Sequence, residues 1–156
     1  MTDPAKSTFV YVTFIRTTQE KLWSALTDPQ TMKAYWFGAQ QVCEWKAGAP
    51  WKLVQDDGRV TDAGEVVAFE PQNRYVVKWR NEAKPELKAE GWSRCSIELE
   101  PAEGAIKLTV THEIDCKDSK LIGAVGGGWP QVLSNLKSLL ETGTPVLGES
   151  GCKSAA

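Results

Sequence analysis

His112 is the only histidine among the 156 residues and the side chain best suited to acid–base chemistry. Imidazole titrates near neutral pH, so His112 could donate a hydrogen bond to a ligand carbonyl or act as a general acid or base. The alternative is a core histidine that is satisfied by a backbone carbonyl or by a side chain from a helix. The sequence places no serine or cysteine beside it, so a nucleophilic triad has no support. One histidine also excludes most zinc sites, and we expect neither metal nor cofactor.

Seven tryptophans are the most unusual feature of the composition. Side chains of this size fill a core, line a cavity, or do both. Four of them are candidates for the wall of an aromatic cavity that takes a planar or greasy ligand: Trp36, Trp51, Trp79 and Trp129. Trp129 follows three glycines, and it could be a gate on a flexible segment or a hydrophobic staple where a helix begins. Trp92 falls on the polar side of its strand and is expected to mark a contact surface.

The cysteines and the acidic residues suggest less chemistry. Four scattered cysteines without CxxC spacing are expected to be reduced thiols: Cys43, Cys95, Cys116 and Cys152. Cys43 and Cys95 lie in apolar stretches and are expected in the core. A redox role for Cys152 has no supporting neighbour. Three aspartates near a predicted hairpin tip are interpreted as turn residues in solvent: Asp56, Asp57 and Asp62.

Charge and hydropathy exclude several classes of partner. The net charge is −2, from 18 basic and 20 acidic residues without a block of either sign, which argues against nucleic-acid binding. No apolar run approaches the ~20 residues that span a bilayer, so membrane insertion is not expected. The polar N-terminus, MTDPAKST, lacks the apolar segment of a secretory signal, and we expect a cytoplasmic protein.

The elements that must position these side chains begin with one strand and two abutting helices. Residues 8–16 are rich in β-branched and aromatic residues and predict a strand. Thr17 and Glu20 form a capping-box pattern before a helix over 19–27. Asp28 and Pro29 then end that helix and start a second one that ends near Trp36.

From residue 40 to 114 the pattern changes to strands separated by turns. Turn signals recur every ~8–12 residues, which is typical of an antiparallel meander. The predicted strands are 40–45, 51–55, 64–70, 75–80, 92–100 and 105–114. The last strand alternates strictly, with Ile106, Leu108, Val110, His112 and Ile114 on one apolar face. A second layer must therefore cover that face.

The segment 129–141 supplies the cover, because Trp129, Leu133, Leu136 and Leu140 recur at helical spacing. The glycines at 126–128 are expected to be a hinge before it. The sequence thus predicts one α+β domain over 8–143, with flexible tails at 1–7 and 144–156. Its sheet has about six to seven antiparallel strands curved around the C-terminal helix, with two short helices after the first strand.

Six segments occur in an order that resembles one known family: EKLWSALTDP, AYWFG, EWKAGAPWKL, AGEVVAFEPQNRYVVKW, KLTVTHEI and GWPQVLSNLKSLLETG. The chain resembles the activator of heat-shock-protein-90 ATPase homologue family, within the START and birch-pollen-allergen-like (SRPBCC) superfamily. The resemblance covers roughly residues 8 to 143. It implies the helix-grip fold and leaves function open, because the superfamily includes ligand carriers, lipid-transfer domains, polyketide cyclases and aromatases. The co-chaperone that names the family has an additional N-terminal domain for which 156 residues leave no room, so a chaperone partner is not expected.

The leading hypothesis is a protein that binds a small hydrophobic or aromatic molecule between its sheet and C-terminal helix. The predicted ligand-binding residues are Trp36, Trp51, Trp79, Val110, His112, Trp129, Leu133 and Leu136. The alternatives are a cyclase- or aromatase-like enzyme with His112 as acid or base, and a protein-interaction module. Ligand identity, oligomeric state and the choice between enzyme and carrier stay open.

Overall fold

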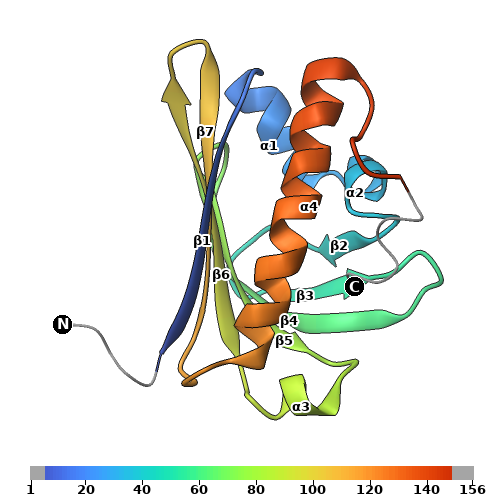
Figure 1. Ribbon diagram of the computed structural model, residues 1–156, viewed down its shortest axis with the longest axis vertical. Helices are drawn as coiled ribbons and strands as arrows, with labels where there is room; N and C mark the ends of the chain where they lie inside the picture. The colour runs from blue at the N-terminus through green and yellow to red at the C-terminus, as the bar shows by residue number, and fades with distance from the viewer. Residues whose placement is uncertain (1–5, 149–156) are drawn as a thin grey trace.

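A seven-stranded antiparallel sheet curves around a long C-terminal helix in the computed structural model, which describes residues 6–148 (Figure 1). The strands are β1 (Ser7–Ile15), β2 (Gln40–Cys43), β3 (Pro50–Val54), β4 (Val60–Glu70), β5 (Arg74–Asn81), β6 (Ser93–Ala102) and β7 (Ala105–Ile114). The helices are α1 (Gln19–Thr27), α2 (Pro29–Tyr35), α3 (Pro85–Lys88) and α4 (Lys120–Thr142). The order across the sheet is β1-β7-β6-β5-β4-β3-β2, and the predicted α+β helix-grip architecture is confirmed.

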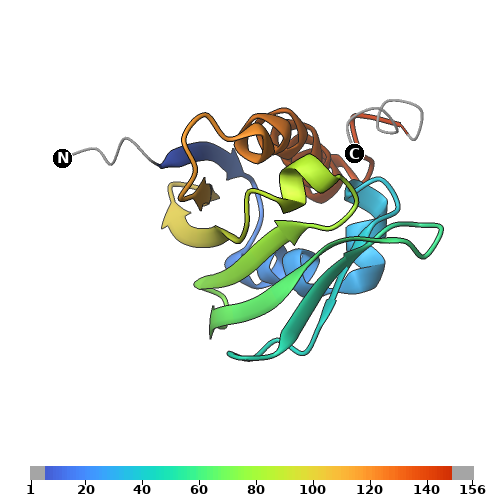
Figure 2. The same cartoon turned by 90° about the horizontal axis from the view of Figure 1, so that it is seen from below.

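Local capping explains the two helices after the first strand. Thr18 rather than Thr17 caps α1, because its backbone is extended and its hydroxyl accepts a hydrogen bond from the Lys21 amide. Asp28 ends α1 and caps α2, where Pro29 occupies the first turn. The two helices close one end of the space that the bent sheet encloses, as the view from below shows (Figure 2).

The hairpin between β6 and β7 sets the register of the inner face. Pro101 lies opposite Ile106, and the same register brings Cys95 opposite His112. Every second residue of β7 from Ile106 to Ile114 is buried, as the alternation predicts. The inner face of this hairpin is therefore continuous with the core beneath α4.

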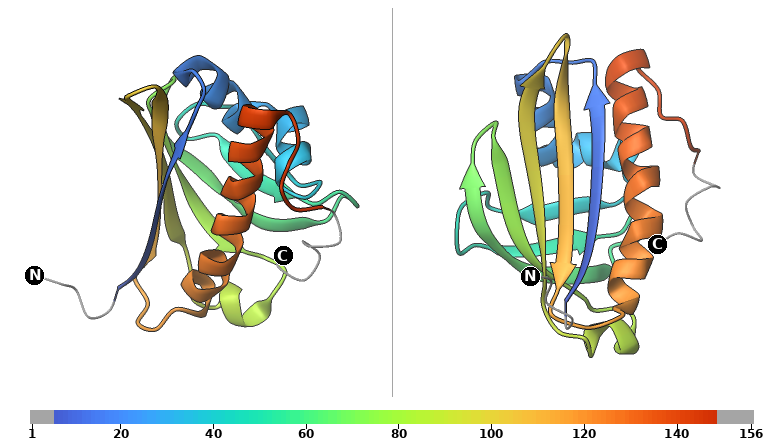
Figure 3. Two further views of the ribbon diagram at one scale, coloured as in Figure 1. Left: turned by 45° about the horizontal axis from the view of Figure 1, so that its top comes forward. Right: turned by 60° about the vertical axis from the view of Figure 1, so that its left-hand side comes forward.

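Helix α4 is longer than the sequence predicts, and the expected hinge at Gly126–Gly128 is wrong. The helix begins at Lys120 with Ser119 as its cap, so the three glycines and Pro130 lie in its interior. A Cβ on Gly126 would lie 3.3 Å from the Phe9 ring of β1, so this glycine permits close packing along the sheet edge (Figure 3). Trp129 is consequently neither a gate on a flexible segment nor a staple where the helix begins.

The connection between β5 and β6 contains a short helix that the sequence analysis did not predict. This helix is α3, whose Leu87 is buried against Ile114 and Leu121. Glu90 then accepts hydrogen bonds from the Ser119 hydroxyl (2.6 Å) and the Lys120 amide (2.8 Å), which satisfies the first turn of α4. The connection therefore fastens the sheet to the start of α4.

The segment after α4 is hydrogen-bonded back to that helix. Beyond α4, Leu147 donates its amide to the Asn135 side chain at 2.7 Å. Residues 1–5 and 149–156, and with them Cys152, lie outside the described residues.

Two glycine substitutions test this account of the helix and sheet. Gly127→Ala should raise the free energy of unfolding by about 1 kcal/mol, because Gly127 is helical and nothing lies within 4 Å of an added Cβ. Gly64→Ala should lower it by about 2 kcal/mol or more, because the Cβ would lie 1.9 Å from the Lys78 carbonyl oxygen. Urea unfolding measures both, and a destabilised Gly127→Ala would contradict a continuous α4.

Candidate functional site

Five aromatic rings meet between the sheet and α4, with Trp79 at the centre. The distances from the centroid of the Trp79 ring to the other ring centroids are 4.7 Å (Trp51), 5.0 Å (His112), 5.9 Å (Trp129) and 6.5 Å (Trp36). These side chains come from β3, β5, β7, α4 and the residue that ends α2. Elements far apart in the sequence thus converge on one cluster.

Three of the four indoles in this cluster are fixed by buried polar side chains. The pairs are Trp51 to Gln41 (2.9 Å), Trp79 to Asp62 (2.6 Å) and Trp129 to His112 (3.3 Å), each from indole Nε1 to its acceptor. A buried indole N–H needs an acceptor, and each acceptor also sets the plane of the ring it holds. These three rings therefore form rigid walls.

Trp36 is the exception among the four indoles. It is half-buried, and no hydrogen bond from its indole nitrogen is found within residues 6–148. Its ring stacks on Trp79 at an interplanar angle of 28° and lies 5.3 Å from the Trp129 ring. Only packing holds this ring between the two fixed walls.

His112 is fully buried, and the chemistry of its partners determines its tautomer. The Trp129 indole can only donate, so Nδ1 of His112 must accept. Ser93 Oγ lies 2.9 Å from Nε2 and donates its own proton to the Trp79 carbonyl at 2.6 Å. His112 is therefore neutral with its proton on Nε2, and it donates to Ser93. This polarity is opposite to that of a histidine that activates a serine nucleophile.

Burial also lowers the pKa of His112 to about 3. The expectation of a pKa near neutral is therefore wrong, because the imidazolium would have to form in a site that solvent does not reach. If His112 is a core residue, a helix side chain can satisfy its ring, and Trp129 of α4 does so. At neutral pH the ring acts as a fixed donor and acceptor rather than as a proton carrier.

Asp62 is not the solvated turn residue that the sequence predicts. It lies in β4 with 6% exposure and accepts from the Trp79 indole, whereas Asp57 does accept from the Arg59 amide in the turn. Burial raises the pKa of Asp62, and hydrogen bonds from Thr61, Trp79 and Asn81 oppose that rise. A buried carboxyl group thus lies at the Nε1 edge of the central ring of the cluster.

The other predicted site residues occupy the same core. Val110, Leu133 and Leu136 are buried in it together with the tryptophans. Two hollows lie elsewhere: one of about 340 Å³ is beside Trp92, and one of about 270 Å³ is between the end of α4 and Val146. The indole rings therefore fill the space that a ligand between sheet and helix would take.

Trp92 lies on the outer face, as predicted, with 46% exposure. The Arg80 guanidinium stacks over its ring at 4.3 Å.

The sequence did not predict the roles of three residues in the cluster: Ser93, Asp62 and Gln41. Ser93 continues the inward alternation of Cys95, and the β6–β7 register places it diagonal to His112, so the hairpin contained this signal. Asp62 was missed because β4 begins at Val60 rather than at the predicted residue 64. No sequence pattern marks Gln41 as the partner of Trp51.

The described residues suggest no metal centre. Within 6–148, no three His, Cys, Asp or Glu side chains are grouped as metal ligands. In the same range, no helix is long and apolar enough to cross a membrane.

The chain matches one known protein family. Residues 16–141 match the family described as Activator of Hsp90 ATPase homolog 1-like protein. No curated protein matches the chain.

Several solved structures resemble the chain. Protein MLL2253 from Mesorhizobium loti is 26% identical, with a TM-score of 0.74 over 86% of this chain and 97% of its own. CalU16 from Micromonospora echinospora is 18% identical, with a TM-score of 0.71 over 92% and 83%. An HSP90 activator from Plasmodium falciparum, PFC0360w, is 22% identical, with a TM-score of 0.68 over 85% and 95%. The last two likenesses concern the fold alone.

The lowered pKa of His112 predicts an acid-labile core. The unfolded chain takes up this proton near pH 6.5 and the folded chain only near pH 3, so the proton favours unfolding as the pH falls between these values. Between pH 7 and pH 5, wild type should lose about 2 kcal/mol more of its unfolding free energy than His112→Gln. Urea unfolding at both pH values measures the difference. Asp62, whose raised pKa acts in the opposite sense, is common to both proteins and cancels; equal losses would refute the buried neutral imidazole.

Proposed function

Because the chain belongs to the Activator of Hsp90 ATPase homolog 1-like family, whose sheet grips its C-terminal helix, we propose that it binds a small aromatic molecule between these two layers. The ligand takes the position that the Trp36 ring occupies, against Trp79 and Trp129. The protein acts as a binding module rather than through covalent chemistry.

The observation that carries this proposal is the contrast among the four indoles. Trp51, Trp79 and Trp129 are each held by a buried acceptor, so their faces stay in place when a neighbouring ring leaves. Trp36 has no such anchor within the described residues and already reaches the surface. Preformed walls around a removable side chain favour binding, because little ordering free energy is lost when a ligand replaces that side chain.

The exchange also limits the size of the ligand. A molecule that displaces Trp36 must recover the apolar contact that the indole gives up, at ~25 cal/mol per Å². It must also replace the stacking of the indole on Trp79 and Trp129, which is worth roughly 0.5–1.5 kcal/mol for each favourable ring pair. A planar ligand of at least two fused rings meets this requirement, whereas a single small ring does not.

The enzyme alternative has less support. A cyclase- or aromatase-like role for His112 needs a ring nitrogen that can exchange protons with a ligand, but Trp129 and Ser93 occupy both nitrogens. The interaction-module alternative is supported by the exposed Trp92 under Arg80, on the opposite face of the sheet. The two faces can be tested separately, because their residues do not overlap.

Removal of the Trp36 ring tests the proposed site. Trp36→Leu should bind 1-naphthalenemethanol at least about tenfold more tightly than wild type, because the probe no longer competes with a stacked indole. Isothermal titration measures both affinities, and Trp36→Ala provides a second variant with a larger opening. Trp92→Ala is the matched control on the outer face and should bind as wild type does. Folded Trp36 variants that gain no affinity would refute the site.

A further inference from the structure

The wall of the proposed site contains one carboxyl group without a cation to balance it. Asp62 accepts the Trp79 indole N–H at 2.6 Å and the Asn81 amide at 3.5 Å, both on Oδ2. The hydrogen bonds from Thr61, Trp79 and Asn81 favour the ionised carboxylate and oppose burial, which raises the pKa of Asp62. Within residues 6–148, no lysine or arginine forms an ion pair with it.

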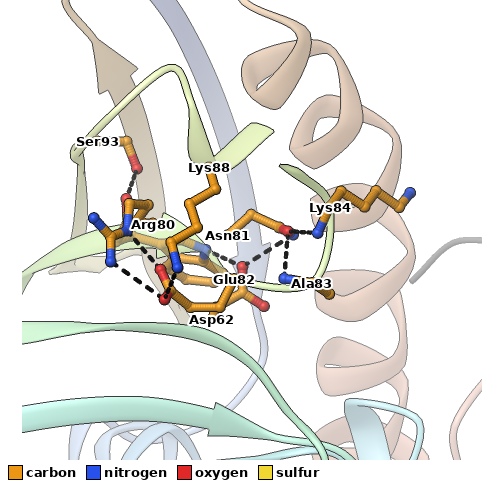
Figure 4. Close-up of polar contacts among 9 residues, drawn as sticks. Asp62, Arg80, Asn81, Glu82, Ala83, Lys84, Lys88 and Ser93 are labelled. Atoms are coloured by element: carbon orange, nitrogen blue, oxygen red, sulfur yellow. Dashed lines mark hydrogen bonds and ion pairs between the residues drawn. The ribbon is translucent and has the colours of Figure 1, made fainter. Parts of the chain in front are cut away.

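The two cations that Figure 4 draws near Asp62, Arg80 and Lys88, pair with Glu82 instead. Arg80 pairs with Glu82 through Nε at 2.5 Å and through its second nitrogen at 3.2 Å, and it also covers Trp92. Lys88 pairs with the same Glu82 at 3.2 Å.

The remaining groups around the cluster also favour positive charge. His112 is neutral, so no buried cation opposes a cationic ligand. The faces of Trp79 and Trp129 present the negative side of the indole quadrupole, which attracts ammonium groups. An aromatic enclosure backed by a carboxylate is therefore selective for cations and repels anions.

Accordingly, we propose that the ligand is a cation, namely a planar aromatic molecule with a protonated or quaternary amine. The inference rests on the proposed function and specifies its ligand class. The ring system replaces the Trp36 indole on Trp79, and the amine lies toward the side of the cluster where Asp62 holds the Trp79 nitrogen. A carboxyl group whose role is only to orient Trp79 would give no preference between ligands of different charge.

Three probes that share one ring system test whether Asp62 selects cations or only orients Trp79. They are 1-naphthylmethylamine as the cation, 1-naphthalenemethanol as the neutral form and 1-naphthoate as the anion. At pH 7 and low salt, wild type should bind the amine at least about tenfold more tightly than the alcohol, and the naphthoate most weakly. In Asp62→Asn, which still accepts from Trp79, the amine-to-alcohol ratio should fall to within about threefold. Glu82→Gln is the matched control for a neighbouring surface carboxylate and should retain most of the preference.

The outcomes distinguish this inference from the function on which it rests. If wild type binds the alcohol or the naphthoate as tightly as the amine, the cation preference is refuted and the aromatic site stands. If none of the three probes binds, the aromatic site fails, and the ligand class fails with it. Should Asp62→Asn not fold, the ratio of affinities in wild type alone decides the matter.

Discussion

The interior of this protein depends on one constraint, that a buried indole must give its N–H to an acceptor. Three tryptophans meet it with three different groups: the Gln41 amide, the Asp62 carboxylate and the His112 imidazole. An unsatisfied N–H there would cost about 1–3 kcal/mol, so ring and acceptor must be buried together. The polar residues of this core are therefore the condition under which so large an aromatic core can form.

The same constraint fixes how α4 sits on the sheet. Trp129 reaches His112 only if the helix lies close to β7, and Gly126 removes the side chain that would hold it away from Phe9 on β1. Ser93 then extends the network, because it accepts from His112 and donates to the backbone of β5. Helix and three strands thus share one chain of hydrogen bonds, so a shift of α4 would leave several buried groups without partners at once.

Periodicity explains what the sequence could predict. The alternation of β7 and the cap at Asp28 are local patterns, and the fold follows from them with few errors. The start of α4 could not be predicted in this way, because Gly126–Gly128 and Pro130 disfavour a helix that Ser119, Glu90 and packing on β1 stabilise. Asp62 and Gln41 depend on side chains from other strands, and such pairings become visible only when the register is known.

The proposed site would resolve a conflict that ligand-binding interiors face. An empty apolar space is unstable, because its walls collapse or lose their contacts. Here three rings are held apart, because their indole nitrogens are hydrogen-bonded to side chains of β2, β4 and β7. The remaining space is filled by Trp36, whose indole nitrogen forms no hydrogen bond within the described residues. The fold can thus be stable with its own side chain in place and still present preformed walls when that side chain leaves. Since the acceptors that hold the walls also set their charge, the groups that stabilise the core are the groups that would select the ligand.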